Sequence, residues 1–184
     1  GRPAFSTGCL DTAAAMGRQN LALLRGGTEP ILFLEPSCYS MFREDYIELK
    51  LDGARELSQR AILFENFVEN LLAKEPDALR FREDGATAIH AHCHTKSLVG
   101  AAPLAKLAAR VPGADVKLLN TGCCGMAGAF GAMESKYALS LKVAEPLRQQ
   151  VDALPAETAV LASGTSCRHQ IGHVCGRHPL HMAE

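Results

Sequence analysis

The sequence predicts an α/β protein in which a parallel sheet is flanked by helices. Four short apolar runs predict strands, and stretches with helical spacing of apolar residues separate them. A cysteine follows each expected strand, at Cys38, Cys93, Cys123 and Cys167. Because the carboxyl ends of parallel strands meet at one edge of a sheet, we expect functional groups to gather there.

The expected elements alternate along the chain. Strands are predicted at 31–34, 86–91, 116–119 and 158–162, and helices at 13–24, 39–51, 54–74, 97–110 and 129–150. Glycine pairs and Pro-Gly steps end two of these helices, at residues 26–27 and 112–113. Pro146 lies inside the last helix and is expected to kink or divide it, since proline has no N–H to donate.

The composition is that of a globular protein with no obvious charged partner. Of 184 residues, 47% are apolar and 21% are charged, with a net charge of −1. This balance does not favour nucleic acid or an acidic membrane surface. No apolar run reaches the ~18 residues of a membrane span. We expect no transmembrane segment and a cytoplasmic location, peripheral to the inner membrane at most through partner proteins.

The beginning of the chain and its cysteine content further restrict the class of protein. Residues 1–8 lack the pattern of an export signal, and the absence of an initiating Met indicates a fragment. Seven cysteines are an odd number, and a secreted disulfide scaffold would be shorter and denser in cysteine. We therefore expect reduced thiols, whose clustering indicates metal or redox chemistry.

The run Gly122-Cys123-Cys124-Gly125 is the most informative motif. Neighbouring side chains point in different directions unless the backbone bends, and glycine permits such a bend. Glycine also lets the backbone approach a bulky object. Paired thiols in this setting favour a soft metal or an iron–sulfur cluster. We predict Cys123 and Cys124 as metal ligands, and Gly122 and Gly125 as backbone that contacts the cofactor.

Cys93 is a third candidate ligand, within the run His90-Ala91-His92-Cys93-His94. If the strand continues, alternation places the three histidines on one face and Cys93 on the other, so they do not all reach one metal. His92 and His94 therefore have two alternatives, a role in the site or hydrogen bonding at the strand end.

Four further cysteines are weighed in the same way. Cys167 follows a Gly-Thr-Ser turn, which favours close approach of the backbone, and Cys38 ends an equivalent strand, so both are candidate ligands. Cys9, next to the start of a helix, is expected to be a small buried residue or a thiol at the end of the fragment. Cys175 is expected in a surface loop, outside the site.

A weak internal repeat relates the two halves of the sequence. Residues 31–38 resemble residues 160–167 as a strand, a turn and a Ser-Cys pair, and residues 1–6 resemble residues 125–130. On this interpretation the chain starts just after an earlier Cys-Cys pair. We therefore predict a truncated first repeat with a helical extension at 1–83 and a complete second repeat at 84–184.

These motifs resemble the cysteine-rich CCG domain, which has a Cys, about thirty residues, Cys-Cys-Gly, some forty residues and a further Cys. Cys93, Cys123-Cys124-Gly125 and Cys167 have this spacing. Residues 122–131 and 163–170 are most similar to one branch of the family. That branch is the iron–sulfur C-terminal part of FAD-linked 2-hydroxy-acid oxidoreductases, of the D-lactate dehydrogenase and glycolate oxidase type. Heterodisulfide reductase B subunits carry the same domain.

The resemblance implies two CCG half-units and an electron-transfer module that passes electrons from flavin to an acceptor. It implies an iron–sulfur cluster, of the 4Fe-4S kind, held by the motif cysteines. It also implies a flavin-binding domain or subunit and a ferredoxin-like iron–sulfur domain as partners, with FAD bound outside this chain. No catalytic residue is assigned, and the fragment of such an oxidoreductase is expected to have no turnover of its own.

One departure from the family leaves alternatives open. The fullest motif ends Cys-x-x-Cys, whereas this chain has Cys167-Arg168-His169-Gln170, so a fifth thiol is missing. Four thiolates suit an ordinary cluster or a tetrahedral metal, so a structural zinc domain without redox function is the main alternative. A thiol–disulfide catalyst is disfavoured, because bridged adjacent cysteines are strained and no Cys-x-x-Cys begins a helix. An interaction scaffold with a decaying site is the remaining alternative.

Overall fold

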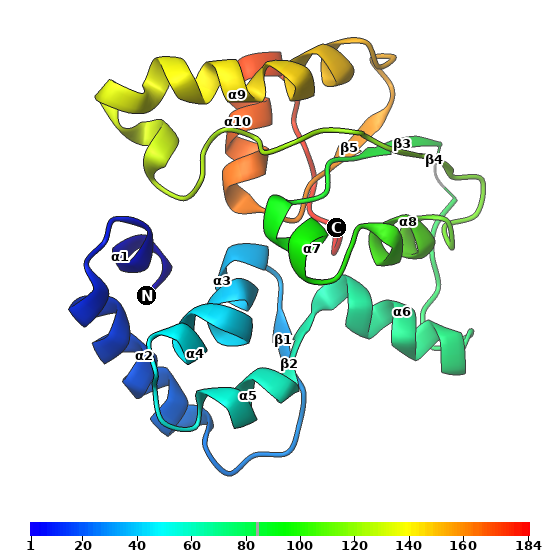
Figure 1. Ribbon diagram of the computed structural model, residues 1–184. Helices are drawn as coiled ribbons and strands as arrows, with labels where there is room; N and C mark the ends of the chain where they lie inside the picture. Colours follow the sequence, from blue (N-terminus) through cyan, green and yellow to red (C-terminus); the bar gives the residue numbers. More distant parts are fainter. Residues whose placement is uncertain (84) are drawn as a thin grey trace.

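Two small parallel sheets form the framework of the protein, whose computed structural model describes residues 1–83 and 85–184 (Figure 1). In the first sheet β1 (Ile31–Phe33) pairs with β2 (Ala61–Leu63). The second sheet has the order β4-β3-β5 and contains β3 (Ala86–Ile89), β4 (Asp115–Leu118) and β5 (Ala159–Leu161). The α/β class and the four predicted strands are confirmed, but the strands belong to two sheets instead of one.

Helices surround the first sheet in the half of the chain that ends at residue 74. They are α1 (Arg2–Ser6), α2 (Leu10–Leu24), α3 (Pro36–Ser40), the π-helical turn η1 (Met41–Asp45), α4 (Tyr46–Glu48), α5 (Ala54–Arg60) and α6 (Phe64–Lys74). Tilted aromatic rings fill the core between these helices and β1. The ring of Phe42 lies 4.8 Å from that of Phe33 and 4.9 Å from that of Tyr46. Such pairs add to the stability that burial alone provides.

The single helix predicted over 54–74 is wrong, because the strand β2 interrupts it between α5 and α6. The apolar residues Leu57, Ala61 and Phe64 keep a helical spacing across the interruption. A strand of three residues is too short to show the two-residue alternation that would distinguish it from a helix in the sequence. Pairing with β1 therefore decides the conformation, and the local pattern does not reveal it.

The second sheet is covered by helices on both faces. The helices of this half are α7 (Cys93–Leu98), α8 (Ala102–Ala108), α9 (Glu134–Asp152) and α10 (Thr165–Cys175), with a 3₁₀ turn η2 (Phe130–Ala132) before α9. Ala88 and Val160 pack in one cluster with Leu147 and Ile171 of α9 and α10. The next residues along the strands, Ile89 and Leu161, pack on the opposite face with Leu104 and Ala108 of α8. This alternation is what a strand buried on both faces requires.

Two helix predictions in this half need correction. The helix expected over 97–110 is two helices, α7 and α8, which the segment around Gly100 separates at a φ of +76°. The helix α10 was not predicted, so Cys175 ends a helix and does not lie in a loop. Pro146 lies inside α9 without dividing it.

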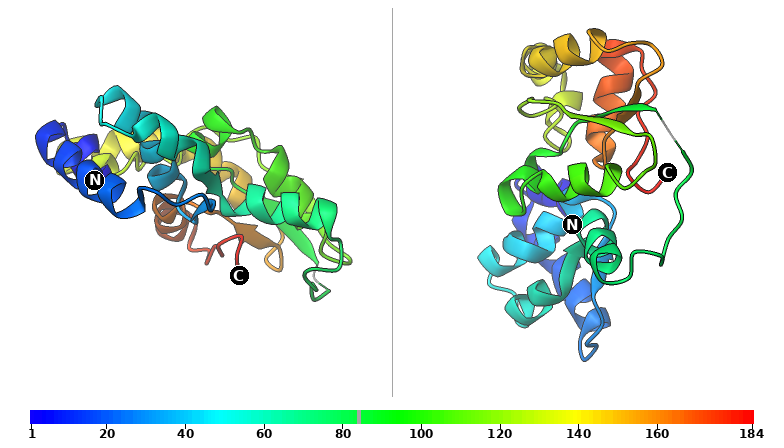
Figure 2. Two further views of the ribbon diagram at one scale, coloured as in Figure 1. Left: turned by 90° about the horizontal axis from the view of Figure 1, so that it is seen from below. Right: turned by 90° about the vertical axis from the view of Figure 1, so that its right-hand side faces the viewer.

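The two halves of the chain contact each other in two places. Val68 and Leu72 of α6 pack against Leu107 of α8, and α3 lies beside α7 (Figure 1). Figure 2 gives the same arrangement in its right-hand view, with the second sheet above the first-half helices. The domain boundary expected at 83/84 falls at Asp84, which lies outside the described residues. None of the described helices combines the length and apolar character needed to cross a membrane.

Candidate metal centre

Three neighbouring strands of the second sheet each lead to a motif cysteine. Cys93 is the first residue of α7, after β3. Cys123 and Cys124 lie in the loop after β4, and Cys167 lies in the first turn of α10, after β5. Because β3 is the central strand and all pairings are parallel, the three strand ends share one edge. The second sheet therefore brings four thiols from distant parts of the sequence together.

The four thiols contact one another in a row. Cys93 interacts with Cys123, Cys123 with Cys124, and Cys124 with Cys167. Hydrogen bonding from Cys124 and Cys93 favours the Cys123 thiolate and holds its pKa far below the ordinary value. The same bonds hold protons on the partners, so the pKa values of Cys93 and Cys124 are raised. Hydrogen bonding from Cys124 outweighs burial at Cys167 and lowers the pKa of that thiol.

The row runs from the interior towards the surface. Cys167 and Cys124 are 1% and 3% exposed, whereas Cys93 and Cys123 are half-buried. All seven cysteines are free thiols. Within residues 1–83 and 85–184, no three His, Cys, Asp or Glu side chains are already grouped around a point that would hold one ion. The thiols thus offer four soft donors, of which two are half-buried and two are buried.

The loop after β4 turns backbone N–H groups towards Cys123. The N–H of Gly125 donates to Cys123 Sγ at 3.3 Å, and the N–H of Ala127 also stabilises this thiolate. Gly125 and Ala127 have positive φ angles of 92° and 40°, which produce the tight bend. Consecutive N–H groups in such a bend form an anion-binding concavity. A thiolate here is therefore stabilised before any metal arrives.

The two motif glycines have different surroundings. A Cβ on Gly125 would lie 2.2 Å from the carbonyl oxygen of Ser140, so this position has no room for a side chain. A Cβ on Gly122 would have nothing within 4 Å, and its φ is ordinary. Gly125 is needed by the fold of the loop. Gly122 leaves open space beside Cys123, in accord with the predicted close approach of a cofactor, which stays a prediction.

Lys96 fixes the start of this loop from α7. Its Nζ donates to the carbonyl oxygen of Thr121 and, at 3.0 Å, to that of Gly122. Because Cys93 begins the same short helix, one element orients Cys93 and also holds the chain that leads to Cys123. The sequence analysis did not single out Lys96, since its partners lie 25 and 26 residues away.

Two glutamates of the first half hold the turn that precedes Cys167. Glu35 Oε2 accepts the N–H of Thr165 at 2.7 Å, and Glu65 Oε1 accepts the hydroxyl of Ser163. Between them, Gly164 packs so closely that a Cβ would lie 2.3 Å from Cδ2 of His92 and 3.2 Å from Cys167 Sγ. Glu35 also accepts the N–H of Ser37 at 3.1 Å, so one carboxylate serves the N-termini of α3 and α10.

The histidines do not share one face as strand alternation would require. The strand ends at Ile89, and His92 is the N-cap of α7, with Nδ1 accepting the N–H of His94 at 3.1 Å. The wholly buried ring of His90 points to Thr121 Oγ1, 2.7 Å from Nδ1, and interacts with Cys167. The expected face pattern is wrong because a helix begins where the strand was expected to continue. His90 was not among the predicted site residues.

The remaining cysteines lie apart from the row. Cys38 is exposed in α3, and its charged neighbours are Glu35, the Gly1 amino group and Arg2. Cys9 is also exposed, so the expectation of a small buried residue is wrong there. Burial raises the pKa of Cys175 to about 11, at the end of α10. Cys38 follows a strand of the other sheet, which explains why it does not join the four thiols.

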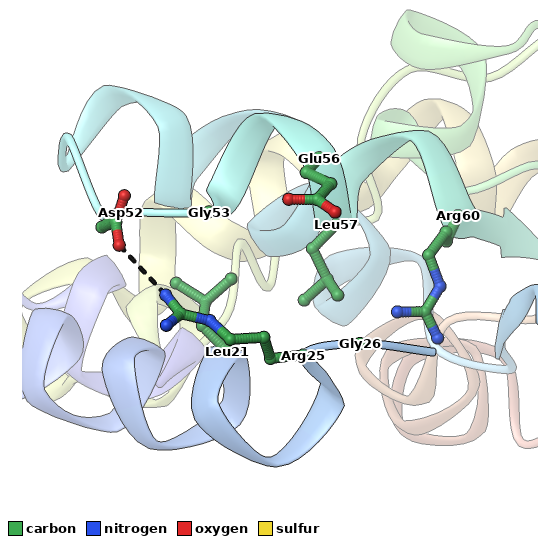
Figure 3. Close-up of a pocket in the computed structure, with 8 residues that line it drawn as sticks. All are labelled: Leu21, Arg25, Gly26, Asp52, Gly53, Glu56, Leu57 and Arg60. Carbon is green, nitrogen blue, oxygen red and sulfur yellow. Dashed lines mark hydrogen bonds and ion pairs between the residues drawn. The ribbon is translucent and has the colours of Figure 1, made fainter. Parts of the chain in front are cut away.

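Two cavities occur away from the thiols. One of about 20 Å³ lies between α2 and α5 in the first half, bordered by the Arg25–Asp52 ion pair and by Arg60 (Figure 3). This volume holds about one water molecule. A second, of about 290 Å³, lies between α9 and α10 and is bordered by Glu145, Arg148 and His173. Neither includes a motif cysteine, so the thiol row is the chemically distinctive site.

Comparison with known proteins supports the resemblance drawn from the motifs. A subunit of the anaerobic glycerol-3-phosphate dehydrogenase of Escherichia coli (strain K12) is 25% identical over 181 residues, covering 93% of this chain and 44% of the relative. D-2-hydroxyglutarate dehydrogenase of the same strain is 30% identical over 158 residues, which cover 82% of this chain and 15% of the relative. D-2-hydroxyglutarate dehydrogenase of Pseudomonas putida (strain KT2440) is 26% identical over 193 residues, which cover 99% of this chain and 18% of the relative.

The chain thus spans less than half the length of these relatives. No solved structure gives a significant match. Residues 87–172 match the cysteine-rich CCG family, and this range includes all four thiols of the row. This segment is therefore similar to the cysteine-rich CCG domain, and the chain as a whole is distantly similar to the glycerol-3-phosphate dehydrogenase subunit and to the D-2-hydroxyglutarate dehydrogenases.

Proposed function

We propose that this chain is an electron-transfer module that holds an iron–sulfur cluster of the 4Fe-4S kind at Cys93, Cys123, Cys124 and Cys167. The observation that carries the proposal is the row of four thiols, in which hydrogen bonding lowers the pKa values of Cys123 and Cys167. Thiolates are the ligands of iron–sulfur clusters, and N–H groups near the sulfurs tune their potential. The loop around Cys123 supplies such groups.

The relatives suggest where the electrons come from. Two are named D-2-hydroxyglutarate dehydrogenase and one is named as a subunit of a glycerol-3-phosphate dehydrogenase, and both names denote oxidation of an alcohol. On this proposal a flavin-binding domain or subunit oxidises a 2-hydroxy acid or a related alcohol. A ferredoxin-like iron–sulfur domain is a further partner, and the present chain passes electrons on without turnover of its own. The half-buried end of the row, at Cys93 and Cys123, is where electrons enter or leave.

A structural zinc site at the same cysteines is the second candidate. A tetrahedral ion needs four donors around one centre, and a Zn–S distance near 2.3 Å places its sulfurs about 3.8 Å apart, which is contact distance. The contacts among these thiols are the observation that favours this candidate. In a cluster each thiolate binds a different iron atom, so the sulfurs would have to move apart on loading.

We also propose that the two halves, 1–83 and 84–184, are copies of one unit. In each half a strand leads into a Ser-Cys pair on a helix, at Cys38 and at Cys167. A later segment then returns parallel to that strand, as β2 does to β1 and as Leu180 does to Leu161. The first copy has two cysteines, Cys9 and Cys38, which are too few to hold a cluster alone, so any role of Cys38 as a ligand needs thiols from elsewhere.

Anaerobic reconstitution with iron and sulfide tests the proposed function. We expect about one cluster per chain, with thiolate-to-iron absorption, iron and acid-labile sulfide in matching amounts. Cys123→Ser with Cys124→Ser abolishes all three signals, while Cys9→Ser retains them as a matched thiol control. Stoichiometric zinc in place of iron after anaerobic purification would favour the structural alternative. Absorption that survives the double substitution would exclude these residues as ligands.

A further inference from the structure

His90 is a buried group next to the thiol row that the proposed function does not use. It directly follows β3, and its side chain is 0% exposed. Its Nδ1 lies 2.7 Å from Thr121 Oγ1. Its Nε2 is buried and makes no hydrogen bond within the described part of the chain. The ring nevertheless lies close enough to Cys167 to interact with its sulfur, at the inner end of the row.

The contact with Thr121 leaves Nε2 as the ring nitrogen available to the thiols. The distance of 2.7 Å between Nδ1 and Thr121 Oγ1 suits a hydroxyl that donates to Nδ1, and it also lies within the range of a ring N–H that donates to the hydroxyl. The interaction of His90 with Cys167 favours the thiolate, as expected of an N–H directed at the sulfur. With Nδ1 acting as the acceptor towards Thr121, that proton is on Nε2.

We propose that His90 donates its Nε2–H to the sulfur of Cys167 when the centre is loaded, and so positions this thiolate and tunes the reduction potential. The inference rests on the proposed function, since it assigns a role at the same cysteines. His90 touches no metal and is a positioning residue. An N–H donor to a ligand sulfur favours the more negative, reduced state of the centre.

Thr121 joins this donor to the Cys-Cys loop. It lies two residues before Cys123, and its hydroxyl determines the direction in which the His90 ring donates. Cys167 and Cys123 would therefore be coupled through Thr121 and His90, although they lie on different strand ends. Two substitutions should therefore weaken the same hydrogen bond to Cys167. His90→Phe removes the donor, and Thr121→Val releases the ring from its preferred tautomer.

The first experiment measures the tautomer in the metal-free full chain. Two-bond nitrogen–proton correlations of ¹⁵N-labelled histidine distinguish a proton on Nε2 from one on Nδ1. We expect His90 as the Nε2–H tautomer, and a mixture of tautomers in Thr121→Val. A proton on Nδ1 in the unaltered chain would overturn the proposal. This measurement needs no bound centre, so it tests the inference separately from the proposed function.

The second experiment measures the reconstituted full chain. We expect His90→Phe to keep the iron and sulfide content but to shift the midpoint potential to more negative values. Thr121→Val should shift the potential in the same direction by less. His169→Phe, on the exposed side of α10, is the matched control and should leave the potential unchanged.

The outcomes separate the alternatives. Loss of iron in a folded His90→Phe chain would make His90 a ligand and overturn the positioning role. An unchanged potential at full loading would also overturn it. If His90→Phe does not fold, the tautomer of His90 and the midpoint potential of Thr121→Val decide whether His90 has the proposed role. If the unaltered chain takes up no iron, the proposed function fails, and the role of His90 at the cluster fails with it.

Discussion

The two halves place a Ser-Cys pair in similar surroundings, but only one half assembles a thiol cluster. Cys38 and Cys167 both follow a parallel strand, and both lie near the start of a helix. Cys38 is exposed with charged neighbours, whereas Cys167 is buried with Cys124 and His90 beside it. The difference lies in the sheets, since β5 has a central neighbour that also ends in a cysteine. A strand-end cysteine becomes a site only when adjacent strands carry partners.

The largest expected effect compares these two cysteines directly. Cys167→Ser should reduce bound iron to background after reconstitution, because it removes the donor at the inner end of the row. Cys38→Ser should retain full loading, because its sulfur has no thiol partner among the contacts described for it. The iron content of both reconstituted variants is measured. Equal loss in both variants would contradict the separation of the two halves.

A second comparison concerns one glycine from each half. Gly125 and Gly53 both have positive φ angles, of 92° and 79°. Gly125→Ala should cost roughly 3 kcal/mol or more of unfolding free energy, because strain adds to an overlap with the Ser140 carbonyl. Gly53→Ala should cost about 1–2 kcal/mol, because its nearest atom, 3.9 Å away, belongs to the flexible Arg25 side chain. Urea unfolding checks both values, and a reversed order would contradict the argument.

The contact between the halves predicts a pH-dependent effect. Burial would raise the pKa of Glu35, but hydrogen bonds from Thr165 and Ser37 outweigh it, and the pKa lies below the ordinary 4.5. Its stabilisation is therefore present above about pH 4.5 and lost as the pH falls through the folded value. Glu35→Gln should cost about 1–2 kcal/mol at pH 7.

The difference between Glu35→Gln and the unaltered chain should shrink in acid, as measured by urea unfolding at several pH values. Glu69→Gln is a matched control. It breaks the ion pair with Arg110, between α6 and α8, but leaves the turn before Cys167 intact. Stability should fall in both variants, and only Glu35→Gln should alter the spectrum of the loaded centre. A constant difference from pH 7 to pH 3 would contradict the role assigned to this carboxylate.

The smallest effect is expected on the outer face of the second half. Arg148 bonds Glu145 and Asp152 along α9, and these side chains are more than two-fifths exposed. Solvent screens such pairs, so Glu145→Gln should leave stability and iron loading unchanged within error. A clear loss of loading in this variant would mean that the site extends to α9.

Much of the second half could be predicted from sequence because its signals are local. Apolar runs followed by Gly-Cys or Ser-Cys steps indicated the strands and the edge where cysteines meet. The sequence could not tell that β1 and β5 belong to separate sheets, since pairing is a long-range choice. Cys38 was therefore grouped with the other four candidates, although the structure keeps it apart.

The residues that support the thiols were missed for a similar reason. Glu35, Glu65 and Lys96 act on partners 25 to 130 residues away, and nothing near them in the sequence marks a special role. His90 had a detectable signal, because it directly follows a short buried strand, where a polar residue needs a partner. Strand alternation, extended past the end of the strand, grouped it with His92 and His94 and concealed that difference.

The short helix α7 has a consequence for the order in which a metal centre assembles. It carries Cys93 at its first residue and, one turn later, the Lys96 that holds the chain before Cys123. The two half-buried sulfurs are thus tied to one short helix. Because Cys124 and Cys167 are buried, a metal that arrives from solvent would reach Cys93 and Cys123 first.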